Sequence, residues 1–286
     1  MRLSIILATR CRPGLLARTV NTTLGNIRHP GTKLVIAADD DDYGTLSCQD
    51  ALNDPRIVWS VKPREDSLGA KYNRVIGVAP AEVYTAMVDH SPHVTPGFDE
   101  KILEAAQIYP DGYCFILNHL ANLSFSQINA TTHKTVEKMG YFFPEYFPYW
   151  FVDHWFEEMA RHLGRQVFVD VMLDGSKRPG SNKADGTMEM KEPYFWGCVF
   201  DALHAERREL AHRIIDAPDF DETPARKRAL KRNAVLHHEW SALINVQLQN
   251  MQGQPVSPDD ARYHRLQQKA IDLVQTYGAT VEKRAA

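Results

Sequence analysis

Short runs of apolar residues that end on polar ones are the feature that most limits how this chain can fold. The runs "LSIILA" (3–8), "LVIAA" (34–38) and "VYTAMV" (83–88) are continuous rather than alternating. A continuous apolar run of this length is typical of a strand buried on both faces, as in a parallel sheet. After the first run, Leu16, Val20 and Leu24 recur at helical spacing. The pattern therefore predicts strands that alternate with helices, which is an α/β domain.

The rest of the chain continues the pattern and then changes. Further strands are predicted at "RIVWSV", "YCFILN" and "QVFVDVML", and helices in the later half of "SLGAKYNRVIGVA", over 99–109 and at "VDHWFEEMARHLG". Residues 174–193 are rich in Gly, Pro, Ser and charge, which predicts a long loop that acts as a lid. The later sequence is helical, with Pro255 and Pro258 separating the last two helices. We predict a mostly parallel sheet domain over 1–193 and a helical C-terminal extension over 194–286.

Composition excludes several classes of protein. The 286 residues are 44% hydrophobic and 24% charged, and the net charge of -3 creates no field that would draw the whole protein to nucleic acid or anionic membranes. The four cysteines have no C-x-x-C spacing, which disfavours a zinc knuckle or a disulfide framework. No window approaches the roughly 20 apolar residues of a membrane span. We expect a cytoplasmic protein without a transmembrane segment.

Familiar catalytic motifs are missing. "GSKRPGS" lacks the Gly-Lys-Ser/Thr ending of a phosphate loop, and no G-x-G-x-x-G follows the first strand. "HHEWSA" has Ala242 where a zinc-protease helix needs its second histidine, and no G-x-S-x-G occurs.

What remains is a set of polar residues at strand ends. Thr9 and Arg10 follow the first strand, the acids of 39–42 follow the second, and Asp89 follows the fourth. The carboxyl ends of parallel strands converge on one crevice. Carboxylates beside a diphosphate suit Mg²⁺ or Mn²⁺, and basic residues hold phosphate oxygens. These residue types predict a site for a nucleotide-diphosphate donor, with Arg10, Arg12 and Lys71 as the basic residues.

Three segments together resemble the family-two group of GT-A glycosyltransferases. They are "SIILATRCRPGLLARTVNTTL", "LGAKYNRVIGVAPAEVYTAMVDHS" and "GYFFPEYFPYWFVDHWFEEMARHLGR", and the resemblance covers roughly residues 1–190. It implies a GT-A (Rossmann-like) fold and transfer of a sugar, with inversion, from a nucleotide-diphosphate sugar to an acceptor hydroxyl. A UDP-sugar is the expected donor, and Mn²⁺ or Mg²⁺ the expected cofactor.

The resemblance also assigns roles by position. Donor binding falls to Thr9, Arg10, Asp39, Asp41, Lys71 and Asn73. The resemblance implies that Asp89 and Ser91 bind the metal and that Asp153 is the general base. It implies that Tyr149 and Trp150, in an aromatic-rich segment, contact the acceptor.

The sequence departs from the family pattern at two places. His90 and Ser91 stand where further acids are usual, so a hydroxyl, His90 or His93 would complete the metal site. After "VFVDVML" the chain has Asp174 where many relatives have a histidine.

Other interpretations stay open at this stage. Asp153 also suits a helix N-terminus, where an acid is stabilised by the helix dipole without a catalytic role. The basic segment "ARKRALKRNAVLHH" is either a solvated helix face or a patch for an anionic acceptor. The acceptor would be a glycan, a small molecule or a hydroxymethylated base in DNA, flipped out of the stack. Because only Asp89 remains of the family's acidic motif, the protein could also be a relative of these enzymes that binds nucleotide or glycan without turnover. A nucleotidyltransferase would need a glycine-rich opening loop, which is missing.

Overall fold

The computed structural model describes residues 2–118, 126, 128–174, 192–216, 222–250 and 258–285. Among these residues, seven strands form one sheet in the order β3-β2-β1-β4-β6-β5-β7. The strands are β1 (Leu3–Ala8), β2 (Thr32–Asp39), β3 (Ile57–Lys62), β4 (Val83–Val88), β5 (Phe115–Asn118), β6 (Asn129–Thr132) and β7 (Gln166–Val169). The four strands β1 to β4 are parallel, so their carboxyl ends meet at one edge.

Strand β6 is antiparallel to both of its neighbours, β4 and β5. It was not predicted, because the segment "NATT" is too short and polar to show a strand pattern. The helix that follows it, α5 (His133–Met139), was not predicted either. The predicted strand over 166–173 is shorter than expected, since β7 ends at Val169 and Leu173 forms only an isolated bridge with His93.

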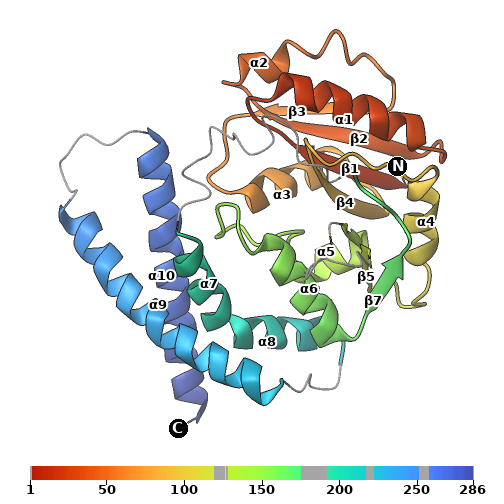
Figure 1. The fold of residues 1–286 in the computed structure, drawn as a ribbon. Coiled ribbons are helices and arrows are strands. Elements are labelled where there is room, and N and C mark those ends of the chain that lie inside the picture. The colour runs from red at the N-terminus through yellow and green to blue at the C-terminus, as the bar shows by residue number, and fades with distance from the viewer. Residues whose placement is uncertain are drawn as a thin grey trace.

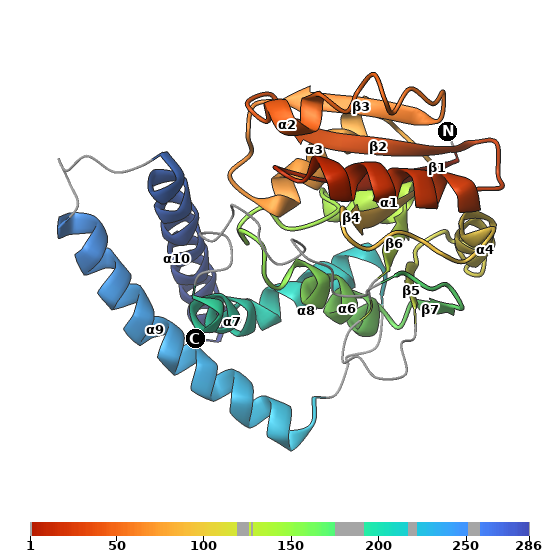
Figure 2. The same ribbon diagram turned by 45° about the horizontal axis from the view of Figure 1, so that its top comes forward.

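Helices cover both faces of the sheet (Figures 1 and 2). On one face, α1 (Pro13–Asn26) and α4 (Phe98–Ala105) pack on strand residues such as Ile5 and Leu7. On the other face, α3 (Leu68–Val78), α5 and α6 (Val152–Leu163) pack on residues such as Ile6 and Ala8. Alternate residues of one continuous apolar strand thus supply both hydrophobic cores. A short helix, α2 (Tyr43–Leu46), follows β2.

The C-terminal region is helical, as predicted. It contains α7 (Pro193–Ala202), α8 (His204–Ile214), α9 (Pro224–Asn250) and α10 (Pro258–Ala285). The helices α7 and α8 meet at Leu203, which separates them. Ile244 of α9 and Leu266 of α10 belong to the same hydrophobic cluster as α3 and α6, and Trp196 Nε1 donates to the Tyr263 hydroxyl at 3.1 Å. A domain boundary near residue 193 remains a proposal, because the hydrophobic cluster continues across it.

In the part of the chain that the structure describes, no helix combines the length and the apolar composition that crossing a membrane requires. The predicted lid falls almost entirely on 175–191, outside the described residues.

Candidate active site

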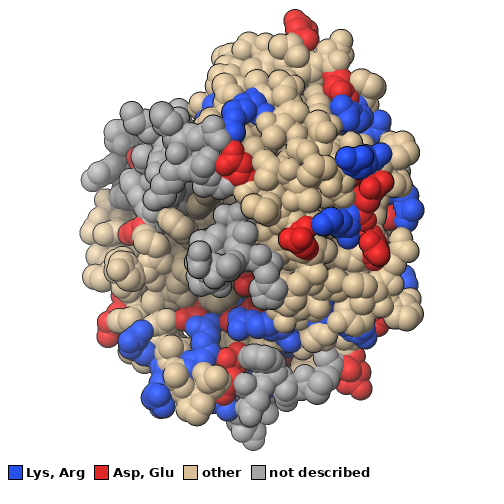
Figure 3. Space-filling view, turned by 45° about the vertical axis from the view of Figure 1, so that its right-hand side comes forward, with Lys and Arg blue, Asp and Glu red and all other residues tan. Residues whose placement is uncertain are grey.

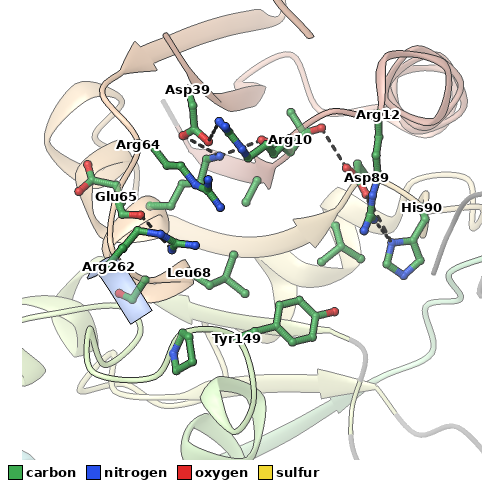
Figure 4. A pocket seen from close by; sticks show the side chains of 16 residues that line it. Arg10, Arg12, Asp39, Arg64, Glu65, Leu68, Asp89, His90, Tyr149 and Arg262 are labelled. Carbon is green, nitrogen blue, oxygen red and sulfur yellow. Dashed lines mark hydrogen bonds and ion pairs between the residues drawn. The ribbon is translucent and has the colours of Figure 1, made fainter. Parts of the chain in front are cut away.

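A cavity lies at the carboxyl edge of β1, β2 and β4 (Figure 4). It is lined by eight of the residues predicted from the sequence, namely Thr9, Arg10, Arg12, Asp39, Lys71, Asp89, His90 and Tyr149. Polar residues that follow separate strands have thus been brought together, because the parallel strands end at the same edge.

The end of β2 supplies a buried carboxylate that is held by two cations. Asp39 is 1% exposed, and its carboxylate lies 2.8 Å from Lys71 Nζ and 3.0 Å from Arg10 Nη1. Lys71 Nζ also donates to the backbone oxygen of Thr9 at 2.8 Å. These contacts tie the ends of β1 and β2 to helix α3 at the floor of the cavity.

The other acids after β2 have different places. Asp41 is half exposed and does not line the cavity; it accepts two hydrogen bonds from Arg10, and this bonding lowers the pKa of Asp41 and raises the pKa of Arg10. Asp42 caps α2 and accepts from the backbone nitrogens of Thr45 and Cys11. Asp39 is therefore the acid of this run that faces the donor cavity.

Asn73, predicted to lie near the donor, lines neither of the cavities described here. Its side-chain oxygen accepts from the backbone nitrogens of Phe142 and Phe143, and its nitrogen donates to the backbone oxygen of Phe143. The amide therefore ties α3 to the aromatic segment before α6. We do not carry Asn73 into the donor site.

Asp89 has both carboxylate oxygens engaged. Oδ1 accepts from Arg12 Nη1 at 2.9 Å, and Oδ2 accepts from the Thr9 hydroxyl at 2.9 Å. His90 Nδ1 lies 3.4 Å from Oδ1. Ser91 lines a neighbouring cavity. His93 is fully buried and stacks on Phe98 at 4.1 Å, and burial lowers the pKa of His93 to about 3, so it is a core residue.

These residues do not fit a resident Mn²⁺ or Mg²⁺ at Asp89. A single carboxylate faces this end of the cavity, and a guanidinium already occupies one of its oxygens. In the described part of the chain, the one group of three potential metal ligands that lie close together is Glu158, His162 and His204, on α6 and α8. Arg207 and Arg226 both pair with that glutamate. An ion at either place would have to displace a guanidinium.

A second cavity adjoins the first and contains the predicted base. Ser91, Tyr149, Trp150 and Asp153 all line it, and it shares Leu68, Val88, His90 and Tyr149 with the donor cavity. Asp153 stands in the first turn of α6 with its side chain 29% exposed. The donor cavity and the carboxylate are thus separated only by a shared wall.

Asp153 has a defined partner. His154 Nδ1 lies 2.8 Å from Asp153 Oδ1, and this hydrogen bond raises the pKa of His154. Phe151, the residue just before α6, has a φ of 72°, a left-handed conformation that is strained for a bulky side chain. Its ring stacks on Phe200 of α7 at 5.4 Å. The C-terminal helices therefore help to hold the turn that presents Trp150 and Asp153 to the cavity.

Two basic residues of the donor cavity were not found from the sequence. Arg64 comes from the loop after β3, and Arg262 comes from α10. Arg262 donates from Nη1 to the backbone oxygen of Asp66 at 2.9 Å. No local signal marks Arg262, because it reaches the cavity only through the packing of α10 on the sheet domain.

The basic segment of α9 is partly used inside the protein. Arg226 Nη2 lies 2.9 Å from Glu158 and 2.8 Å from Asp201. On the face seen in Figure 3, Lys and Arg side chains lie among Asp and Glu side chains instead of forming one continuous basic surface.

The sheet order, the antiparallel β6 and the cavity at the carboxyl edge define a GT-A fold, as the sequence resemblance predicted. Solved structures with this fold include the mannosyltransferase PcManGT from Pyrobaculum calidifontis in complex with GDP-Man and Mn²⁺, with a TM-score of 0.51, 13% identity, and coverage of 96% of this chain and 86% of that one. They also include S. aureus TarS 1-349 in complex with UDP-GlcNAc, with a TM-score of 0.54, 14% identity, and coverage of 99% and 92%. No family model matches the sequence, and no curated protein matches it.

Proposed function

We propose that this protein is a glycosyltransferase that takes a sugar from a nucleotide-diphosphate sugar and transfers it, with inversion, to an acceptor hydroxyl. One observation carries the proposal: a cavity rich in basic side chains shares a wall with a second cavity that holds Asp153. The first suits a nucleoside diphosphate, and the second suits an acceptor. The nucleotide sugars in the complexes of the two similar structures support the same assignment.

Each residue then has a defined task. Thr9, Arg10, Asp39 and Lys71 form the floor on which the nucleoside diphosphate lies, and Tyr149 in the shared wall borders both substrates. Asp153 accepts the proton of the acceptor hydroxyl as its oxygen attacks the anomeric carbon. The attack comes from the side opposite the leaving diphosphate, so the configuration inverts.

The identity of the acceptor stays a prediction. A glycan or a small molecule suits the aromatic wall formed by Tyr149 and Trp150. A hydroxymethylated base in DNA would require a basic surface, and binding that weakens steeply with salt would be its signature. A cytoplasmic location also stays a prediction. The Mn²⁺ or Mg²⁺ cofactor expected from the resemblance is not part of the proposal, because the residues at Asp89 do not fit it.

The proposal is tested first at the donor site. UDP, GDP, UDP-GlcNAc and GDP-Man are added to the protein in a thermal-shift assay, with MnCl₂ or with EDTA. A ligand at 100 times its dissociation constant stabilises the native state by about 2.7 kcal/mol. At least one nucleotide should raise the melting temperature. If no nucleotide does so under either condition, the assignment of the donor cavity is wrong.

The base is tested with Asp153→Asn, using the donor that binds. We expect turnover to fall by about 10²–10⁴-fold while the donor affinity is unchanged, because only proton transfer is lost. Glu100→Gln is the matched control: it removes an acid from the first turn of α4, where only the helix dipole is affected. Equal turnover in the two variants would show that Asp153 has only a structural role.

A further inference from the structure

The donor cavity contains more basic than acidic side chains. Arg10, Arg12, Arg64, Lys71 and Arg262 line it, against Asp39, Glu65 and Asp89. A site built for a divalent cation collects carboxylates, whereas a diphosphate carries negative charge that basic side chains neutralise directly. The charge of this cavity therefore matches a diphosphate that arrives without an ion.

Arg12 is the basic side chain at the position where an ion would be needed. Its Nη1 lies 2.9 Å from Asp89 Oδ1, and the two side chains are only 15% and 5% exposed. Figure 4 shows Arg12 reaching from the start of α1 toward Asp89 and His90. Its Nε is buried and finds no hydrogen-bond acceptor among the described residues. The guanidinium is thus anchored by Asp89 at one nitrogen and keeps donors for a further anion.

The pair is held in place from both sides. The hydroxyl of Thr19, one turn and a half into α1, donates to the backbone oxygen of Asp89 at 2.8 Å. The Thr9 hydroxyl donates to the second carboxylate oxygen of Asp89. The same helix therefore carries Arg12 at its start and fixes the strand end that binds Arg12. Such preorganised donors need no rearrangement when charge develops on a ligand.

We propose that Arg12, held by Asp89, takes the place of the divalent ion and binds the donor's diphosphate, so that sugar transfer in this protein proceeds without a metal. The inference rests on the proposed function. In the step, the acceptor oxygen forms a bond to the anomeric carbon, and the bond from that carbon to the terminal phosphate oxygen breaks. The acceptor's proton goes to Asp153. The electron pair of the broken bond stays on the diphosphate, and the Arg12 guanidinium stabilises this charge.

The first experiment compares metal dependence in the wild type. Binding of UDP and GDP is measured by calorimetry, and turnover of UDP-GlcNAc and GDP-Man by release of the nucleoside diphosphate, in EDTA and in MnCl₂. We expect the affinity and the rate to differ by less than about twofold between the two conditions, since Arg12 supplies the charge. A rate that requires Mn²⁺ and disappears in EDTA would overturn the inference and leave the proposed function standing. Absence of any nucleotide binding would instead remove the proposed function.

The second experiment replaces the arginine. Arg12→Ala should lower turnover in EDTA by about 10²–10³-fold, the loss typical of removing one donor that stabilises a developing anion. Arg12→Lys keeps the charge but not the planar fork and should lose less. Arg2→Ala is the matched control: Arg2 precedes β1, at the opposite end from the cavity, and pairs with Glu82 on the surface. Its turnover should equal that of the wild type.

A third experiment tests whether Mn²⁺ binds to the protein, and a comparison of stability with turnover tests whether Arg12 acts in the reaction or only in the structure. Mn²⁺ binding is followed by the electron paramagnetic resonance signal of the free ion, with and without UDP. We expect the wild-type protein to cause no loss of free Mn²⁺ beyond the loss that UDP alone causes, because Arg12 occupies Asp89. If Arg12→Ala turns over the donor as fast as the wild type and has the same melting temperature, a role for Arg12 in the reaction is refuted. If Arg12→Ala does not fold, the comparison is made with Arg12→Lys, for which wild-type affinity and wild-type turnover in EDTA would refute the role of Arg12.

Discussion

The close approach of α3 to the aromatic segment before α6 yields a sharp prediction at Gly69. A Cβ added at this glycine would lie 2.2 Å from the backbone oxygen of Pro144 and 2.8 Å from its carbonyl carbon. Ordinary contacts of a Cβ begin near 3.4 Å. Gly69→Ala would therefore require the two backbones to separate by about 1 Å, in a region that is packed at the density of a crystal.

The separation is opposed on both sides of the glycine. The backbone nitrogen of Leu68 donates to the oxygen of Pro148 at 3.1 Å, and Asn73 holds Phe143. Overpacking of this kind typically destabilises a protein by about 1–3 kcal/mol. Pro148 and Tyr149 line the donor cavity, and a displacement of about 1 Å at a reacting site can lower the rate by about 10²-fold.

The matched control lies on the same helix. A Cβ at Gly77 would meet nothing within 4 Å, so Gly77→Ala should stabilise the protein by about 0.5–1 kcal/mol through helix propensity. Chemical denaturation gives both free energies of unfolding, and nucleotide binding with turnover reports the site. We expect Gly69→Ala to be less stable and less active than Gly77→Ala. Equal stability and equal turnover in the two variants would refute the argument from close approach.

Other predictions follow from single contacts. Arg262→Ala should weaken nucleotide binding by about tenfold, whereas Arg265→Ala on the same helix, which does not line the donor cavity, should not; calorimetry with UDP and GDP compares them. Burial lowers the pKa of His93 to about 3 from its ordinary 6.5, so the unfolded chain binds the extra proton between these values. The contribution of the neutral, buried His93 to the free energy of unfolding is therefore fully present above about pH 6.5. It is lost as the pH falls toward 3, by as much as about 5 kcal/mol, and His93→Phe should flatten this part of the plot of unfolding free energy against pH. Glu158→Ala leaves Arg207, which is fully buried, without its carboxylate and should destabilise the protein by about 3–5 kcal/mol. Zinc should not raise the melting temperature of the wild type, and a zinc-dependent increase would indicate that the glutamate and its two histidines bind metal.

The sequence predicted the elements whose patterns are long and regular. The apolar runs of β1, β2 and β4 and the helical spacing of α1 lie where expected, because a buried strand or an amphipathic helix is encoded in a few consecutive residues. The prediction failed for β6, whose residues are buried although two of its four are threonines and one is an asparagine. Tertiary packing overrides weak local preference in such a segment.

The candidate site also contains residues whose place could be predicted from the sequence and residues whose place could not. Thr9, Asp39 and Asp89 could be predicted to face one cavity, because each ends or directly follows a strand of a parallel sheet. The different roles of neighbouring acids could not be predicted. Asp39 faces the cavity while Asp42 caps α2, and this depends on how the chain turns after β2. Asn73 has the right residue type for a ligand but is used to hold the aromatic segment.

The sequence by itself determined the alternation of strands and helices, the polar residues at the strand ends, and the position of Asp153 at the start of a helix. These are local properties, set within a few residues by side-chain periodicity and by turn chemistry. Only the tertiary structure decided which cation meets which carboxylate. Arg12 and Asp89 are 77 residues apart, and Arg262 and Asp66 are 196 residues apart. Their contacts arise from the packing of helices on the sheet, because burial of the shared hydrophobic core brings distant charged groups to one place, where each must find a partner.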